Sequence, residues 1–414
     1  MQNIIIEGGI LDRESIRQAL LKSCDNRGKC SKVLLIPPDI TRLHSGAGLI
    51  TSLYYEIFTK EGISVDILPA LGSHVPVTRE EQLAFFGDIP EERFLVHNWR
   101  DGVTTLGEIS SSYVREVSEG LVDTAIPVQV SKYLADPSYD RIISIGQVVP
   151  HEVVGMANYT KNIVVGCGGS KFISASHILG AFYGVERVMG QVDTPTRKLF
   201  DYAEEHFISK IPVEYVLTVT VEGKIIGLYI GSGRELFERA SALSQKKNIV
   251  YVDRPIRQCV AYLDELEFHS LWLGNKAVYR TRMAMADGGD LLVLAPAVKT
   301  FGEDEEVDRL IRKYGYVGRE KLIQLCNNEP ELKQNLSAAA HMIFSSSDGR
   351  FSITYAAPQM GREAIESVGY KYMDWDEAIS LYDHKKLKPG YNGPQDKEVY
   401  YIPNAALGLW QVKK

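Results

Sequence analysis

Short apolar runs alternate with amphipathic stretches through the first half of the chain, and this alternation constrains the fold more than any other feature. The runs are continuous and rich in Val, Ile and Leu, which is typical of strands buried on both faces of a parallel sheet. They are KVLLIPPD (32–39), ISVDILPALG (63–72), RIISIGQVV (141–149) and NIVVGCGG (162–169). The pattern predicts an α/β fold with mostly parallel sheets.

Helix signals lie between these runs. Asp12 precedes the periodic stretch 13–23 and is placed to cap it. Thr78 and Glu81 have the spacing of a capping box, and Gly87 marks the end of that helix. Residues 213–233, VEYVLTVTVEGKIIGLYIGSG, contain two strand-like runs around a turn and predict an antiparallel hairpin.

The chain of 414 residues is too long for one typical core and predicts two α/β domains. A second unit begins near NIVYVDRP (248–255), and the tail VYYIPNAALGLWQV (399–412) is apolar enough to need burial. We therefore expect an N-terminal domain of residues 1–250, to which residues 386–414 return, and a C-terminal domain of residues 251–385.

Composition excludes several classes of partner. The net charge of -7 argues against nucleic acid, whose phosphates require a basic surface. No apolar run approaches the ~20 residues that span a bilayer, and the start, MQNIIIEGGILDR, lacks the basic and apolar regions of a signal peptide. The five dispersed cysteines contain no CxxC pair. We expect a cytoplasmic protein with no membrane or nucleic-acid partner.

Polar side chains follow the predicted strands at the ends where ligands bind in open α/β sheets. Asp39, Thr41 and Arg42 follow the first strand, and His74 follows the second. His151 follows the third, and the fourth leads into Gly168 and Gly169. Each group alone fits a structural role, such as a turn cap or a hydrogen-bonded loop residue. Their coincidence at successive strand ends predicts one shared crevice.

The segment after the third strand also holds Lys161 and His177. We expect SHILGAFYGVERVMG (176–190) to form a helix with His177 in its first turn, a rigid mount for a metal ligand. The run GCGGS (166–170) is placed to offer backbone N–H groups to a phosphate. It does not match GxGxxG, and the chain has no GxxxxGK[ST] motif.

At these residues the sequence resembles the lactate racemase family, the 2-hydroxyacid racemases and epimerases that use a nickel-pincer nucleotide. The family's D-x-T-R segment is matched by Asp39, Thr41 and Arg42, and its G-[ST]-H segment by LGSH, ending at His74. Its H-x9-K-x15-H spacing is matched in full by His151, Lys161 and His177, and its K-x-x-Y element by Lys276 and Tyr279.

The resemblance implies a nickel-dependent isomerase whose cofactor is a pyridinium-3-thioamide-5-thiocarboxylate mononucleotide carrying nickel. Lys161 would tether the cofactor, His177 would complete the nickel coordination, and His74 and His151 would be the acid/base pair. Asp39, Thr41, Arg42, Gly168 and Gly169 would surround the cofactor, and Lys276, Tyr279 and Arg42 would bind the substrate. It further implies cofactor-building enzymes as maturation partners and an active site in the cleft between the domains.

Hydride transfer explains why such residues are needed. The C–H bond beside a carboxylate is a very weak acid, and a positioned base contributes only roughly 10²–10⁴-fold. Removal of hydride instead gives a neutral ketone, so that a base needs to take only the alcohol proton. Imidazole, with an ordinary pKa near ~6.5, suits that step in both directions. Inversion at carbon uses both faces of the substrate, and therefore two histidines.

Two departures from the family pattern concern the pocket. The small, Gly-rich stretch before the lysine is MANYT (156–160) here, and Leu273 stands where lactate racemase has glutamine. The second departure predicts a 2-hydroxyacid larger than lactate, such as a sugar acid or a longer aliphatic acid. Two alternatives remain at this stage: a nucleotide-linked 2-hydroxyacid dehydrogenase and a non-catalytic sensor that retains the cofactor site.

Overall fold

The computed structural model describes residues 3–25, 30–394, 397–405 and 408–413. The chain divides into two compact units. Unit 1 comprises Met1–Leu179 and Met189–Lys247, and unit 2 comprises Gly180–Val188 and Asn248–Lys414. Each unit has a mostly parallel sheet with helices, which confirms the α/β class. The chain therefore passes between the units three times.

Unit 1 is built on a six-stranded sheet of order β1-β10-β9-β6-β2-β3. The strands in that order are Ile4–Glu7, Lys224–Gly231, Val213–Val221, Arg141–Gln147, Lys32–Ile36 and Ser64–Ile67. β9, β6, β2 and β3 are parallel, whereas β1 and β10 are added antiparallel. The expected hairpin is confirmed: β9 and β10 join through Glu222 and Gly223, both with positive φ.

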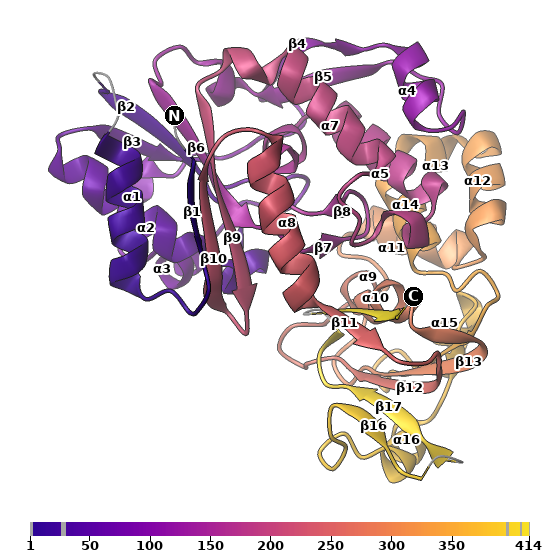
Figure 1. Cartoon of the computed structure of the whole chain (residues 1–414). Coiled ribbons are helices and arrows are strands. Elements are labelled where there is room, and N and C mark those ends of the chain that lie inside the picture. Colours follow the sequence, from indigo (N-terminus) through magenta and orange to yellow (C-terminus); the bar gives the residue numbers. More distant parts are fainter. Residues whose placement is uncertain (1–2, 26–29, 395–396, 406–407, 414) are drawn as a thin grey trace. The chain divides into compact units, whose positions relative to one another are not determined.

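Alternation along each strand gives unit 1 two cores, one on each face of the sheet. In β2, Val33 and Leu35 face one core, and Leu34 and Ile36 face the other. The first core is covered by α1 (Arg13–Asp25), α2 (Ala47–Lys60) and α3 (Arg79–Phe86), and the second by α5 (Ser170–Tyr183), α7 (Pro195–His206) and α8 (Arg234–Asn248) (Figure 1). The strands thus lie between two helical layers.

The predicted helix boundaries in this part are confirmed. Ser15 N–H donates to Asp12 Oδ1 at 2.8 Å, at the start of α1. Thr78 and Glu81 form the complete capping box of α3, and Gly87 ends that helix with a left-handed φ of 78°. Smaller elements of unit 1 are β4 (Val103–Ile109), β5 (Ile126–Ser131), α4 (Ser111–Val117), β7 (Pro150–His151) and β8 (Gly155–Met156).

The fourth predicted strand of this half is wrong. Asn162–Gly166 forms a π-helical turn, in which Cys167 N–H donates to Asn162 C=O at 3.0 Å. The whole turn is buried. A short, continuously apolar run indicates that a segment is buried. It does not indicate whether the segment is a strand or a helical turn, because it has no periodic pattern. Single π-helical turns occur frequently at functional sites.

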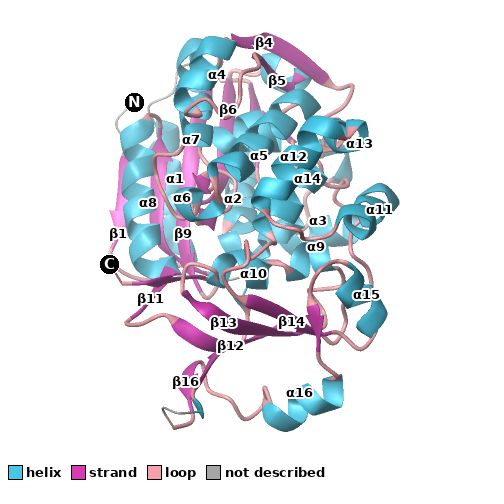
Figure 2. Ribbon diagram, turned by 90° about the vertical axis from the view of Figure 1, so that its right-hand side faces the viewer, coloured by secondary structure: helices cyan, strands magenta, loops and turns pink. Residues whose placement is uncertain are grey.

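Unit 2 contains a second six-stranded sheet, of order β15-β14-β13-β12-β17-β16. The strands in that order are Lys371–Tyr372, Ser352–Ala356, Met285–Leu294, Ile256–Tyr262, Val399–Ile402 and Gly390–Asn392. All neighbours are parallel except β16, which is antiparallel to β17. Helix α16 (Trp375–Leu381) packs through Ala378 on one face of this sheet (Figure 2).

The remaining helices of unit 2 connect its strands, except α6, which lies in the separate segment Gly180–Val188. They are α6 (Val185–Val188), α9 (Leu271–Gly274), α10 (Lys276–Thr281), α11 (Glu305–Tyr314), α12 (Arg319–Asn328), α13 (Pro330–Gln334), α14 (Leu336–Phe344) and α15 (Arg362–Ser367).

The C-terminal tail belongs to unit 2, so the expectation that residues 386–414 return to the first domain is wrong. β17 pairs with β12 in parallel, Val260 opposite Tyr401. β18 (Leu409–Val412) pairs with β11 (Ile249–Val252), also in parallel. The apolar composition of the tail correctly indicated burial, but it carried no information about which sheet would accept the strands.

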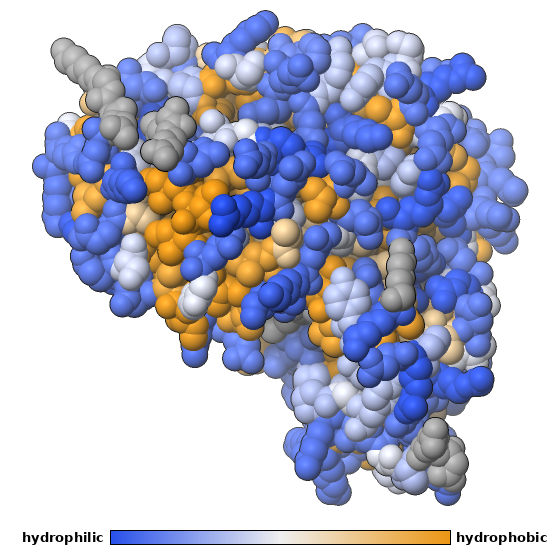
Figure 3. Space-filling model, in the orientation of Figure 1, coloured by the Kyte–Doolittle hydropathy of each residue, from blue (hydrophilic) through white to orange (hydrophobic). Residues whose placement is uncertain are grey.

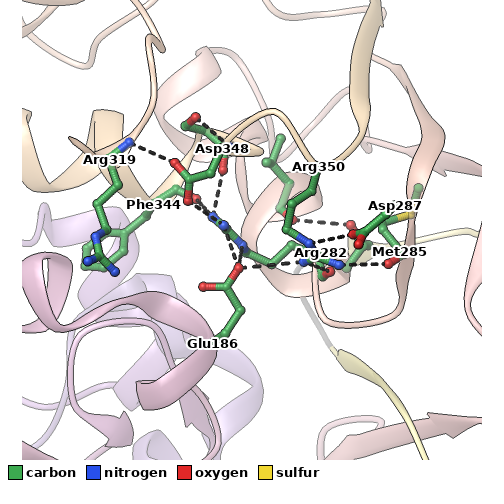
Figure 4. Close-up of polar contacts among 11 residues, drawn as sticks. Glu186, Arg282, Met285, Asp287, Arg319, Phe344, Asp348 and Arg350 are labelled. Atoms are coloured by element: carbon green, nitrogen blue, oxygen red, sulfur yellow. Dashed lines mark hydrogen bonds and ion pairs between the residues drawn. The ribbon is translucent and has the colours of Figure 1, made fainter. Parts of the chain in front are cut away.

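A polar cluster fixes the segment Gly180–Val188 into unit 2 (Figure 4). The side chain of Arg282 is 1% exposed and pairs with Glu186 of α6 at 2.6 Å and with Asp348 at 2.9 Å. The same guanidinium donates to the carbonyl of Ser346 at 2.7 Å. A buried arginine with all of these acceptors is a strong constraint on the short helix α6.

Apolar side chains gather on the surface over β1 and β10, the antiparallel edge of the unit 1 sheet (Figure 3). Ile4, Ile5 and Ile6 of β1 are each only half-buried. Among the residues that the structure describes, no helix has the length and apolar character needed to cross a bilayer.

Candidate functional site

The end of β2 presents a carboxylate that orients a histidine. Asp39 caps the 3₁₀ turn Ile40–Ser45, accepting from Thr41 N–H at 3.1 Å and from the Thr41 hydroxyl at 2.5 Å, both on Oδ1. Its other oxygen, Oδ2, lies 2.5 Å from His74 Nδ1. The His74 side chain remains 57% exposed. The carboxylate therefore holds the Nδ1 proton and leaves His74 Nε2 as an exposed proton acceptor.

The environment keeps Asp39 ionised. Burial by itself would raise the pKa of Asp39, but the hydrogen bond and charge of His74, the Thr41 hydroxyl and the Arg42 charge outweigh it and lower the pKa. An ionised carboxylate on Nδ1 stabilises the imidazolium that forms when the ring takes up a proton. This arrangement suits His74 to act as a general base.

His151 is buried and has the opposite proton arrangement. It lies in the two-residue strand β7, and its Nδ1 accepts Val153 N–H at 3.1 Å, so the neutral ring carries its proton on Nε2. Burial lowers the pKa of His151 well below 6.5, and the charges of Lys161, Arg42 and His177 lower it further. Glu152 Oε2 lies 3.6 Å from the same Nδ1 and opposes this shift.

Lys161 follows a backbone segment in an uncommon conformation. Asn158 and Tyr159 have φ values of 67° and 58°, in the left-handed region that non-glycine residues rarely adopt. For a bulky residue this conformation costs roughly 1–2 kcal/mol. Burial lowers the pKa of Lys161 to about 8, with Arg42 and Arg197 adding to the shift. The neutral, nucleophilic form of the amine is therefore far more populated near neutral pH than in an ordinary lysine, although it remains the minor form.

His177 lies near the middle of α5, because this helix begins at Ser170. The expectation of a first-turn position is therefore wrong. The expected helix 176–190 is present only in part, because Gly184, with a φ of 104°, separates α5 from α6. The apolar face of residues 178–189 marked the helix, but its start lies in the preceding segment SKFISA (170–175), where small and polar residues hide the periodicity. His177 Nδ1 donates to Ile173 C=O at 2.7 Å, which fixes the ring.

These residues converge in unit 1. The charges of Lys161, Arg42 and His177 act on His151, and those of Lys161 and His74 act on His177. A hydrogen bond joins the segment that contains His74 to the π-helical turn that follows Lys161. Gly72 N–H, two residues before His74, donates to Gly166 C=O at 2.8 Å. Charge interactions and hydrogen bonds thus bring one set of predicted residues together, and a shared crevice among them stays a prediction. The set is Asp39, Thr41, Arg42, His74, His151, Lys161 and His177.

The glycines before α5 have a packing role. A Cβ on Gly168 would lie 1.9 Å from the Val164 carbonyl oxygen, and one on Gly169 would meet the Gln129 side chain at 2.6 Å. We expected this run to offer its N–H groups to a phosphate. Instead, the N–H groups of Gly168, Gly169 and Ser170 donate to the carbonyls of Val165, Gln129 and Trp99, at 3.1 Å in each case. Cofactor binding by these two glycines stays a prediction.

The predicted substrate residues of the second domain lie in unit 2. Lys276 and Tyr279 are both on α10, where Tyr279 is buried and Lys276 is half-buried, with its Nζ 5.6 Å from the Phe268 ring centre. Leu273 lies on α9, and its N–H donates to Ser270 Oγ at 3.2 Å. Their roles toward a substrate stay predictions.

Three residues that position the site were not identified from the sequence. Asn162 Nδ2 donates to Ile36 C=O at 3.1 Å and to Ser144 Oγ at 3.0 Å, which ties the π-helical turn to β2 and β6. Arg197 bonds the loop before Lys161. Glu152 lies beside His151. Glu152 is adjacent to a candidate in the sequence, whereas the other two act through long-range contacts that leave no local pattern.

The side chains fit the implied cofactor. Because Nδ1 of His177 donates to Ile173, Nε2 of the neutral ring has a lone pair for a metal. Burial lowers the pKa of His177 to about 4, so the ring is neutral near pH 7. Within the described ranges, no group of three or more His, Cys, Asp or Glu residues could hold a metal ion. One histidine suffices where the cofactor itself supplies the other metal ligands.

Known proteins share the N-terminal sequence pattern and the fold of this chain. Residues 11–190 match the family model for the lactate racemase N-terminal domain. A crystal structure of a protein from Thermotoga maritima is similar over 99% of this chain and 100% of its own, with a TM-score of 0.84 and 25% identity. No curated protein matches the sequence.

The lactate racemase apoprotein from Thermoanaerobacterium thermosaccharolyticum shares the fold, with a TM-score of 0.73 and 17% identity over 100% of this chain and 95% of that one. The matched N-terminal domain contains Asp39, His74, His151, Lys161 and His177, the residues that the structure brings together. Residues 11–190 are therefore similar to the N-terminal domain of lactate racemases, and the chain as a whole shares its fold with a lactate racemase.

Proposed function

We propose that this protein is a racemase or C2-epimerase of a 2-hydroxyacid, acting by reversible hydride transfer to a lysine-tethered nickel-pincer nucleotide. The observation that carries the proposal is the pair of histidines with opposite proton arrangements. His74 has its Nδ1 on the Asp39 carboxylate and its Nε2 available as an acceptor. His151 has its Nδ1 accepting a backbone N–H and its proton on Nε2.

Inversion requires one group that takes the alcohol proton on one face and another that returns a proton to the ketone oxygen on the other. His74 accepts at Nε2, and the Asp39 carboxylate stabilises the charge that develops on its ring. His151 presents an N–H from a buried position. To act as the base in the reverse direction, it must carry its proton on Nδ1, where Glu152 lies 3.6 Å away.

The tethered nucleotide, when bound, supplies a hydride acceptor that stays on the protein. Lys161 would hold it covalently, and His177 would complete the nickel coordination through Nε2. Arg42, whose charge acts on Asp39, Lys161 and His151, would hold the substrate carboxylate beside them. Holding both reactants in one geometry is itself a large contribution to the rate.

A substrate larger than lactate follows from Leu273, which cannot donate a hydrogen bond where lactate racemase has a glutamine. A site that lacks a polar partner for its substrate loses discrimination by several kcal/mol. Lys276 and Tyr279 of α10 would bind the substrate as their counterparts in the family pattern do.

The test is to produce the protein together with the cofactor-building enzymes and to measure intact mass and nickel content. We expect a sulfur- and nickel-containing adduct on Lys161, and racemisation of single enantiomers from a panel of 2-hydroxyacids. Lys161→Arg keeps the charge but cannot form the thioamide, so it should carry no adduct and show no activity. An active Lys161→Arg variant would refute the assignment.

An isotope experiment separates hydride transfer from proton abstraction. A substrate deuterated at C2 should keep its deuterium in the inverted product and react more slowly than the protonated one. Loss of the label to solvent would contradict hydride transfer. A nucleotide-linked dehydrogenase would instead release keto acid in proportion to reduced nucleotide, which the same samples would show.

A further inference from the structure

The loop before the tether lysine, Met156–Thr160, adopts a conformation that its own residues disfavour. Asn158 and Tyr159 are consecutive non-glycine residues with left-handed φ values of 67° and 58°. Such a conformation persists only where surrounding structure enforces it. The aromatic ring of Tyr159 is buried and lies 4.4 Å from the Tyr215 ring and 5.3 Å from the Phe237 ring, centre to centre.

Arg197 makes the hydrogen bonds that hold this loop in its left-handed conformation. This side chain is fully buried, and its guanidinium donates to three oxygens of the loop. Nη1 donates to Thr160 Oγ1 at 2.7 Å, and Nη2 donates to Met156 C=O at 2.7 Å and to Asn158 C=O at 3.2 Å. One rigid group thus bridges the two ends and the middle of a five-residue loop.

The guanidinium is itself held in place. Arg197 lies in the first turn of α7, where its N–H donates to the capping hydroxyl of Thr194 at 3.0 Å. That hydroxyl donates in turn to Val154 C=O at 3.1 Å. The guanidinium carbon lies 4.3 Å from the centre of the Phe237 ring, the ring that also stacks on Tyr159. Helix α7 and the loop are therefore fixed to each other at several points.

The conformation of the loop determines where Lys161 emerges. Lys161 N–H donates to Asn158 C=O at 3.3 Å, and Asn162 N–H donates to Tyr159 C=O at 3.0 Å. The two left-handed residues therefore start the turn that carries the lysine. We propose that Arg197 is a positioning residue for Lys161, and that it presents the amine to the cofactor by holding Met156–Thr160 in the left-handed conformation.

This inference rests on the proposed function in naming Lys161 as the tether, but one of its measurements is independent of the cofactor. In unloaded full-length protein, the reaction of Lys161 with an acetylating reagent is followed by peptide mass spectrometry across pH. The wild-type amine should react with a midpoint near pH 8, since burial and the nearby cations lower its pKa to about 8. In protein made with the cofactor-building enzymes, the fraction of Lys161 carrying the adduct is measured.

Arg197→Lys keeps a positive charge but cannot bridge the three oxygens. We expect the adduct fraction to fall at least tenfold and the acetylation midpoint to rise by at least one pH unit. Asn158→Gly removes the disfavoured backbone choice, because glycine adopts the left-handed conformation readily. The double variant, Asn158→Gly with Arg197→Lys, should therefore carry at least three times the adduct fraction of Arg197→Lys alone.

Two matched variants serve as controls. Arg234→Lys alters a neighbouring arginine near Phe237 that binds Asp193 and Asp201 and does not bind the loop, so it should leave both readouts unchanged. Glu119→Gly introduces glycine at another left-handed residue, with φ of 57°, and should give no recovery.

The inference is overturned if Arg197→Lys matches the wild type in both readouts, or if Asn158→Gly gives no recovery. A wild type without any adduct on Lys161 would instead refute the proposed function. The acetylation profiles would then decide the role of Arg197 alone.

Discussion

At the scale of single residues, the site depends on a few hydrogen bonds that set proton positions. Asp39 and Thr41 form a carboxylate–hydroxyl pair behind His74, while Val153 and Glu152 act on opposite protonation states of His151. Asp39, His74 and His151 were identifiable from the sequence because they follow apolar runs, whereas Lys161 and His177 were identified by the spacing of the family pattern. The partners were not all identifiable, because Arg197 reaches its loop from 37 residues away in the sequence.

Asp39→Asn tests the orientation of His74. The amide cannot stabilise the imidazolium as a carboxylate does, so we expect kcat to fall on the order of 100-fold with little change in KM. Thr41→Val is the matched control, since it removes a bond to the other carboxylate oxygen and keeps the bond to His74. Equal effects of the two variants on kcat would contradict this role for Asp39.

Glu152→Gln tests the second histidine. We expect the loss to be larger in the direction where His151 accepts the proton, because only a carboxylate favours a proton on Nδ1. Initial rates from each pure enantiomer, with substrate deuterated at C2 to separate the steps, give this asymmetry in single-turnover experiments. The assignment fails if both directions slow by the same factor, as they would through a general loss of packing.

Leu273→Gln tests the basis of substrate choice. Restoring a hydrogen-bonding side chain should raise kcat/KM for lactate by about tenfold, equivalent to about 1.4 kcal/mol, relative to the best larger acid. Chiral chromatography of both reactions measures the ratio, and Leu273→Met controls for a change of shape alone. An unchanged ratio would show that other residues exclude lactate.

At the scale of helices and strands, the sequence predicted those elements whose structure depends on neighbouring residues in the chain. The caps at Asp12 and Thr78 and the β9–β10 hairpin depend on neighbouring residues, and they were predicted correctly. The π-helical turn Asn162–Gly166 and the strand β17 depend on distant partners, namely the Asn162 bonds to β2 and β6 and the pairing with β12. Periodicity carries no information about such partners.

The short helix α6 gives a prediction at this scale. Arg282→Met leaves carbonyl and carboxylate acceptors without their donor, but Glu186 and Asp348 are about one-third exposed and Glu186 keeps Arg350. We expect the free energy of unfolding to fall by about 1–3 kcal/mol. Denaturant unfolding measures this, and Asp253→Asn, which breaks the exposed pair with Lys413, should leave the transition unchanged. A small effect of Arg282→Met would mean that α6 is held by apolar contacts alone.

At the scale of the whole molecule, the order of the strands in the unit 1 sheet differs from their order along the chain. In unit 1 the sheet runs β1-β10-β9-β6, so strands from residues 213–231 separate the first strand of the chain from the parallel strands that carry the site. Val33, Leu35, Ile143 and Ile145 share their core with Val216, Leu228 and Ile230 of those later strands. The sheet of the first unit is therefore complete only at Gly231, and the unit itself only at Lys247.

A fragment limited to residues 11–190, the range that matches the family model, should consequently fail to fold. It lacks β1, β9 and β10, which exposes one side of β6, and its Glu186 loses Arg282. Circular dichroism and amide exchange would show this, with the full chain as reference. A cooperatively folded fragment would contradict the interdependence of these strands.

Helix α5 has a consequence for how such a protein can be recombined. Its residues up to Leu179 belong to unit 1 and those from Gly180 to unit 2, with His177 two positions before the change. Suppose that two relatives recombine by a single crossover near residue 248. Each recombinant then takes α6 from one parent and the residue at position 282, which pairs with α6, from the other. We therefore expect such a recombinant to stay stable only where both parents carry the Glu186–Arg282 pair.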